Sequence, residues 1–171
     1  LEWWWNLQKL CATDICDSTY REIFKYQENM IHDVCENGHE DVLEWWVNLC
    51  KKMGYKLLYC DNMINIACKN GDVNMLEWLK NSEYEFKYDE GAINDACFYG
   101  HVNVLEWLKN SGYVVKCEGA AILNASGEGH IEVLEWFKKN IYDLAADCDL
   151  IQAAEVGTKD VYEWFETNGY V

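Results

Sequence analysis

A short motif that recurs along the chain limits its possible folds more than any other feature. Leu-Glu-Trp occurs at residues 1–3, 43–45, 76–78, 105–107 and 134–136, and Tyr-Glu-Trp follows at 162–164. Successive tryptophans lie 42, 33, 29, 29 and 28 residues apart. Self-similarity at such a period is typical of repeat proteins, in which each unit packs on its neighbours. From Met30 onward, each column of the repeat can therefore be interpreted as one structural position.

Each unit contains two amphipathic segments separated by a glycine. Small and apolar residues recur at i, i+3 and i+4 before the glycine, as in residues 93–97, and large apolar residues follow it, as in 104–108. This spacing predicts two short helices. A glycine between them fits a left-handed C-terminal residue, and the next residue (Asp72, His101 or Thr158) fits a helix cap or a bond to the turn backbone. The glycines of this column are Gly38, Gly71, Gly100, Gly129 and Gly157.

Neither helix of a unit can bury its apolar face alone, but stacked pairs can. The sequence therefore predicts an all-α helix–turn–helix solenoid that forms one array over residues 1–171. We expect residues 1–10 to be the second helix of a truncated repeat, 11–29 to be an irregular connection, and 30–171 to hold five helix pairs. Because neither end carries the polar cap of a terminal repeat, we expect a longer array to continue beyond them.

Composition and charge narrow the class of partner. The formal net charge is −16, and half of the residues are hydrophobic. Such an acidic chain is repelled by phosphate backbones and by anionic membrane surfaces. No apolar run approaches the ~18 residues that a membrane span needs. We therefore expect no nucleic acid, no membrane and no small-molecule substrate as a partner, and a protein partner remains.

The nine cysteines are explained by packing. Cys35, Cys68 and Cys97 share a column with Ser126 and Ala154, so small size is what the position requires. Stacked helices lie about 8–10 Å apart, whereas a disulfide needs Cα atoms within about 7 Å. We therefore predict no intramolecular disulfide and a reducing compartment.

The tryptophan column is expected in the core, because aromatic residues at helical spacing are usually buried. The glutamate beside each tryptophan is expected on a solvated outer face, where pairs such as Glu77–Lys80 stand at i, i+3. Neither a phosphate-binding loop nor a nucleophile elbow occurs. Cys11 and Cys16 are five residues apart, and His32-x-x-Cys35 is a lone pair without a second pair at zinc spacing. We therefore predict no enzyme activity, no cofactor and no metal.

These motifs together resemble a known family. The pattern Ala-Cys-x-x-Gly-His-x-x-Val-Leu-x-Trp-Leu resembles the ankyrin repeat, and residues 100–112 are similar to the ankyrin-type arrays of giant viruses of amoebae. The resemblance implies a non-enzymatic protein–protein interaction scaffold or adaptor in the cytoplasm, which is the host cytoplasm if the protein is viral, with the virion as the alternative location. Two departures stand out: the chain has no proline, and its 29-residue units are shorter than the usual ~33. We therefore expect short inter-repeat loops.

Variable positions predict where a partner binds. The resemblance implies that partners meet a concave face built from the first helices and the adjoining loops. On that face the repeat pattern is broken by Lys69, Phe86, Tyr88, Phe98 and Tyr99. Clustered aromatic residues are typical of interaction hot spots, although Phe98 or Tyr88 packing between repeats is an equal alternative. An alternative function is a structural component of a virion or large assembly, packed permanently against neighbouring proteins.

Overall fold

The computed structural model describes residues 27–54, 62–82, 89–113, 119–140 and 150–171. These residues form ten helices and no strand. They make five helix–turn–helix pairs: α3 (Gln27–Glu36) with α4 (Glu40–Met53), α5 (Met63–Asn70) with α6 (Val73–Asn81), α7 (Glu90–Phe98) with α8 (Val102–Asn110), α9 (Gly119–Glu128) with α10 (Ile131–Asn140), and α12 (Leu150–Val156) with α13 (Lys159–Thr167). None of these helices is long and apolar enough to cross a membrane.

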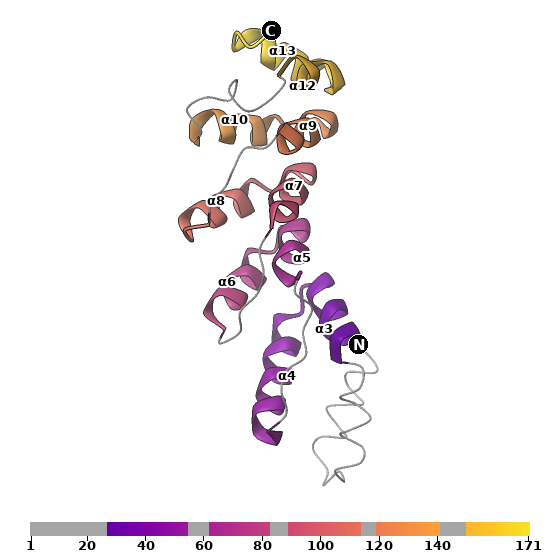
Figure 1. The fold of residues 1–171 in the computed structure, drawn as a ribbon, viewed down its shortest axis with the longest axis vertical. Helices are drawn as coiled ribbons and strands as arrows, with labels where there is room; N and C mark the ends of the chain where they lie inside the picture. Colours follow the sequence, from indigo (N-terminus) through magenta and orange to yellow (C-terminus); the bar gives the residue numbers. More distant parts are fainter. Residues whose placement is uncertain (1–26, 55–61, 83–88, 114–118, 141–149) are drawn as a thin grey trace.

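The pairs are stacked into an elongated array (Figure 1). Each first helix contacts the next along the series α3, α5, α7, α9 and α12, and the second helices α4, α6, α8 and α10 form a second column beside them. The predicted all-α solenoid is therefore confirmed. Helix α3 begins at Gln27, earlier than the repeat pattern indicates. The expectations for residues 1–10 and most of 11–29, and for most of the inter-repeat loops, lie outside the described residues.

The core follows the repeat columns. A small alanine on each of the later first helices (Ala67, Ala96, Ala125 and Ala153) faces large apolar residues of the second helices, which include Leu76, Leu105 and Leu134, and all are at most 1% exposed. Small residues let the helices approach, and each large aliphatic side chain contributes about 1.5–3 kcal/mol through burial. One continuous cluster of buried residues runs through all five pairs.

Glycine is required between the helices of a pair for one of two structural reasons, a left-handed backbone conformation or close packing. Gly38, Gly71, Gly100 and Gly129 have φ values from +64° to +82°, the left-handed region that the sequence predicts. Gly157 does not, so the prediction is wrong there. A Cβ at Gly157 would lie 2.5 Å from Cγ1 of Val161, so close packing of α13 rather than backbone conformation requires the glycine.

The residue after the glycine behaves in two ways. Asp72 Oδ1 accepts a hydrogen bond from Met75 N at 3.0 Å, and Thr158 Oγ1 accepts one from Val161 N at 3.4 Å, so both cap their helices as predicted. The histidines do not cap. His101 Nε2 donates to the carbonyl oxygen of Lys69, and His130 Nε2 donates to that of Phe98, each at 3.0 Å.

These histidines connect neighbouring repeats, because each bonded carbonyl belongs to the preceding pair. The imidazole ring of each histidine also lies directly over the inter-helix glycine of the preceding repeat. A Cβ on Gly71 would be 2.7 Å from His101 Nδ1, and a Cβ on Gly100 would be 2.6 Å from His130 Nδ1. At these two positions the glycine is therefore required twice, by its own φ and by the imidazole of the next repeat.

The tryptophan column is less buried than expected. Trp136 and Trp164 are buried, but Trp45, Trp78 and Trp107 are only half-buried. Three of the tryptophans donate a hydrogen bond to a glutamate of the preceding repeat: Trp107 Nε1 to Glu77 Oε2 at 2.6 Å, Trp136 Nε1 to Glu106 Oε2 at 2.8 Å, and Trp164 Nε1 to Glu135 Oε1 at 2.5 Å. We call this series the Trp–Glu ladder. It joins each second helix to the one before it.

The ladder corrects the expectation for the glutamate column. Glu77, Glu106 and Glu135 are exposed, as predicted, and each carboxylate accepts a hydrogen bond from a tryptophan of the next repeat. The lysine three residues on also acts on the carboxylate electrostatically at Glu77 and Glu106. The lysines form a second inter-repeat series: Lys80 Nζ donates to Ser111 Oγ, Lys109 Nζ to Asn140 Oδ1, and Lys138 Nζ to Asn168 Oδ1. The indole bond is the main reason why the pKa of Glu77 and that of Glu106 are lowered.

The cysteine column is a packing column in the described repeats. Cys35, Cys50, Cys68 and Cys97 are buried, and none of these four forms a disulfide. Burial raises the pKa of Cys50 to about 11 and those of Cys68 and Cys97 to about 12. Ser126 occupies the same column, and its buried Oγ has no hydrogen-bond partner among the described residues. The remaining five cysteines lie outside the described residues.

Candidate functional site

Three of the five predicted partner-binding residues lie where the first helices end. Lys69 is exposed in the last turn of α5, and Phe98 and Tyr99 are 39% and 45% exposed at the end of α7. Phe98 is therefore not packed between the repeats, which was the alternative considered from the sequence. Phe86 and Tyr88 lie outside the described residues, so their contribution stays a prediction.

Phe98 and Tyr99 form an ordered aromatic pair. Their ring centroids are 5.0 Å apart in an edge-to-face arrangement, and Tyr99 stacks on His101 with centroids 6.1 Å apart. His101 in turn donates to the carbonyl oxygen of Lys69, while His130 holds the carbonyl oxygen of Phe98. The two histidines thus connect three of the predicted residues across neighbouring repeats, a connection that sequence reasoning did not find.

Charge around the pair is mixed. Asp95 lies one helical turn before Tyr99, and partial burial raises its pKa, while the ammonium of Lys69 acts in the opposite direction. Lys69 on one repeat and Asp95 on the next therefore provide a cation and an anion beside the aromatic rings. Such a polar setting around an apolar centre is typical of protein interfaces.

Apolar exposure continues in the same columns towards the C-terminus. Val156, in the column of Tyr99, is 49% exposed, and Ile151 of α12 is 61% exposed in the column of the half-buried Leu123. The repeat register places Val156 on this face, but neither residue is among the partner-binding residues predicted from the sequence. We call the exposed side of the first helices, comprising Lys69, Phe98, Tyr99, Leu123, Ile151 and Val156, the first-helix surface.

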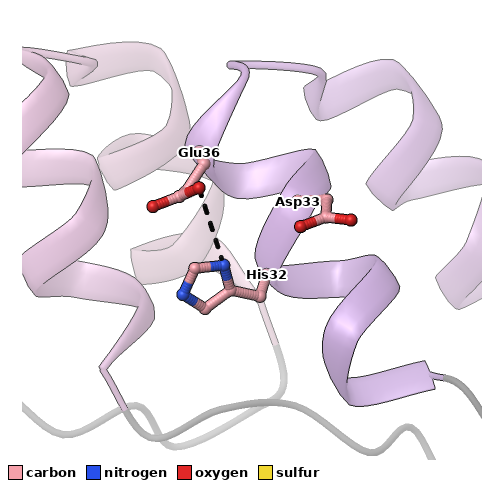
Figure 2. A group of neighbouring side chains, drawn as sticks. All are labelled: His32, Asp33 and Glu36. Carbon is pink, nitrogen blue, oxygen red and sulfur yellow. Dashed lines mark ion pairs between the residues drawn. The ribbon is translucent and has the colours of Figure 1, made fainter.

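A group of possible metal ligands occurs on α3. His32, Asp33 and Glu36 each offer one ligand atom, and these atoms lie within 4.8 Å of one another. Figure 2 shows His32 directed towards Glu36, with Nδ1 3.9 Å from Oε2. All three come from one helix and are at least partly exposed, while Cys35, the sequence partner of His32, is fully buried. His32 and Glu36 form an ordinary i, i+4 ion pair on the helix surface when His32 is protonated.

Comparisons with known proteins agree with the architecture. Residues 31–79, which span α3 to most of α6, match the family model of ankyrin repeats. No match was found among curated proteins or among solved structures. Ankyrin repeats are generally protein–protein interaction modules, and the family is typically non-enzymatic. The same helix pair recurs beyond this segment up to Thr167. Residues 31–79 are thus similar to ankyrin repeats, and the helix–turn–helix pairs of the described chain have the same repeated arrangement.

Proposed function

We propose that this chain is a non-enzymatic scaffold or adaptor that holds a protein partner on the first-helix surface. The site centres on Lys69, Phe98 and Tyr99, with Phe86 and Tyr88 of the preceding segment contributing. The observation that carries the proposal is the exposed Phe98–Tyr99 pair in the middle of the array. Packing within the fold does not explain why two neighbouring rings remain in solvent.

The fixed geometry of the pair favours tight binding. Binding orders side chains, and this costs about 0.5–1.5 kcal/mol for each flexible side chain. Tyr99 is already stacked on His101, and the backbone of Phe98 is already held by His130, so less order must be imposed. Large rings that lose little entropy are the usual anchors of protein interfaces.

The proposal includes a location and an origin. We place the array in the cytoplasm of a host cell, on its resemblance to the ankyrin-type arrays of giant viruses. The four buried cysteines, none of which forms a disulfide, support a reducing compartment. The net charge of −16 supports a protein partner over nucleic acid or an anionic membrane.

The alternative function is a structural component of a virion or large assembly. Ile151 and Val156 favour it, because exposed aliphatic side chains on the first-helix surface suit a permanent apolar contact. The two functions differ in stoichiometry. A structural component co-purifies with assembled particles in a constant ratio, whereas an adaptor exchanges between bound and free forms.

The test combines capture with a matched pair of variants. Wild-type protein is used to capture partners from host lysate, and the binding of the identified partner is then measured by calorimetry. Phe98→Ala/Tyr99→Ala should weaken binding by at least about 2 kcal/mol, the hot-spot threshold, with the melting temperature nearly unchanged. Tyr162→Ala is the control, since this ring is also exposed, at 46%, but lies on a second helix. Equal effects of both changes would contradict the proposed surface.

A further inference from the structure

One position in the columns of the first-helix surface carries no side chain. Gly127 lies in the last turn of α9, two residues before the inter-helix glycine, where other repeats hold larger residues such as Lys69 and Phe98. Positive φ or close packing explains the inter-helix glycines, but neither applies to Gly127: its φ is not positive, and a Cβ there would meet nothing within 4 Å. Because glycine destabilises a helix relative to alanine, the fold itself does not favour this residue. Gly127 leaves open space in the column of Phe98.

The carbonyl oxygen of Gly127 also lacks the donor that its equivalents have. In the three preceding repeats this carbonyl oxygen accepts a hydrogen bond from the next repeat, as that of Phe98 does from His130 Nε2 at 3.0 Å. Thr158 occupies the histidine position of the following repeat, and its hydroxyl accepts from Val161 N instead. No group of the described residues donates to the Gly127 carbonyl, so an acceptor remains beside the open space.

The surroundings of this carbonyl are acidic. Glu128 follows Gly127, and Glu155 occupies the same column one repeat further on. Both carboxylates are exposed, and neither forms an ion pair within the part of the chain that the structure describes. The last turn of α9 contains no basic residue, and a helix C-terminus carries a partial negative charge. A cation that has N–H donors is therefore the complementary group.

We propose that the open space at Gly127 receives an arginine side chain of the protein partner. This inference deepens the proposed function and rests on it, because Gly127 belongs to the same face as Phe98. A guanidinium is planar and carries several N–H donors and no acceptor. It can cover the glycine backbone, donate to the Gly127 carbonyl, and reach the carboxylate of Glu155, since stacked helices lie about 8–10 Å apart.

The neighbouring ring and the overall charge favour the same ligand. Phe98, one repeat before Gly127, is 39% exposed and offers an aromatic face to a cation. The net charge of −16 accelerates the approach of a basic segment. A lysine ammonium is a compact charge that cannot present two parallel donors, so it fits this site less well. An indole has a single donor and no charge, and it would leave the carboxylates unpaired.

The experiment follows the backbone amide signals of ¹⁵N-labelled protein by NMR during titration with three blocked peptides. Their sequences are Ala-Ala-X-Ala-Ala, with arginine, lysine or citrulline at X, and citrulline keeps the planar shape of arginine without its charge. We expect the arginine peptide to shift the signals of Gly127, Glu128 and Gly129 saturably. The lysine peptide should bind several-fold more weakly, and the citrulline peptide at least about tenfold more weakly, because charge-assisted hydrogen bonds are lost.

Two variants test the space and the carbonyl separately. Gly127→Gln fills the open space and should weaken the arginine peptide by at least about tenfold, because it excludes the guanidinium from its acceptors. The melting temperature should not fall, since glutamine is the better helix former. Thr158→His offers the Gly127 carbonyl the imidazole that the earlier repeats provide, and it should weaken the peptide several-fold by occupying the acceptor.

Matched controls separate a site from general attraction. Ala120→Gln adds the same side chain to an exposed position in the first turn of α9, and it should change affinity less than about twofold because it touches none of the acceptors. Glu155→Gln should weaken the arginine peptide several-fold, whereas Glu166→Gln, at an exposed position on α13, should change affinity less than about twofold, since distant exposed charges are screened.

Three results would overturn the inference: equal affinities for the three peptides, equal weakening by Gly127→Gln and Ala120→Gln, or no saturable shift at Gly127. The proposed function is tested apart from the peptides, by Phe98→Ala/Tyr99→Ala against the captured partner. If that double variant weakens the partner while the peptides fail, the arginine site is wrong and the surface stands. If the peptides bind as expected while the double variant leaves the partner unaffected, the proposed function is wrong.

Discussion

Gly100 provides the sharpest test of how the repeats are held together. Its φ is +75°, and a Cβ there would lie 2.6 Å from Nδ1 and 2.8 Å from Cε1 of His130. His130 cannot move away freely, because its Nε2 donates to the carbonyl oxygen of Phe98 at 3.0 Å. Gly100→Ala should therefore strain the backbone and displace the imidazole that joins two repeats.

The expected magnitude is the sum of two effects. The left-handed conformation costs an alanine about 1–2 kcal/mol, and loss of the His130 hydrogen bond costs about 0.5–1.5 kcal/mol. Gly112→Ala is the matched control, since Gly112 has a φ of +84° and nothing within 4 Å of a Cβ. It should cost only the backbone strain, about 1–2 kcal/mol. The difference between the two variants measures the contact with His130.

A double-mutant cycle isolates that contact. His130→Ala alone should cost about 0.5–1.5 kcal/mol, and in its background Gly100→Ala should cost no more than Gly112→Ala does. The free energy of unfolding is measured by urea denaturation with far-ultraviolet circular dichroism, at constant m-value. Equal costs of Gly100→Ala and Gly112→Ala in the wild-type background would refute the reasoning. A coupling energy of zero between positions 100 and 130 would refute it as well.

Three further predictions concern the ladder, the buried serine and the thiols. Trp107→Phe should raise the pKa of Glu77 towards its ordinary value and leave the pKa of Glu106 unchanged, as measured by NMR titration. Because the pKa of Glu77 is lowered in the folded protein, the stability that this carboxylate contributes is present above its unfolded-state pKa and is lost as the pH falls through its folded-state pKa. Ser126→Ala should raise the free energy of unfolding by about 1 kcal/mol, since it removes a buried hydroxyl that has no hydrogen-bond partner among the described residues; a loss of stability in urea would contradict this. A thiol reagent should modify the buried cysteines Cys50, Cys68 and Cys97 only after unfolding. Modification of these three thiols in the native protein would argue against their assignment to the packed core.

The repeat register made much of the architecture predictable from sequence. Helix–turn–helix pairs, the left-handed glycines and the caps at Asp72 and Thr158 all depend on residues close together in the chain, so local propensity is enough to predict them. The small column of Cys35, Cys68, Cys97 and Ser126 was likewise predictable, because periodicity fixes which face of a helix is buried. The candidate residues Lys69, Phe98 and Tyr99 emerged from the same register as departures from a pattern.

Contacts between repeats depended on the tertiary structure. Local pairing at i, i+3 suggested Glu77 with Lys80, but stacking brings Trp107 within 2.6 Å of that carboxylate from a residue 30 positions away. Gly157 has the same place in the repeat as Gly100 and yet serves close packing with Val161 instead of a positive φ. Sequence columns identify which residues are equivalent. How far one repeat is shifted and rotated on the next decides which of those residues touch, and that depends on side chains packing across the whole stack.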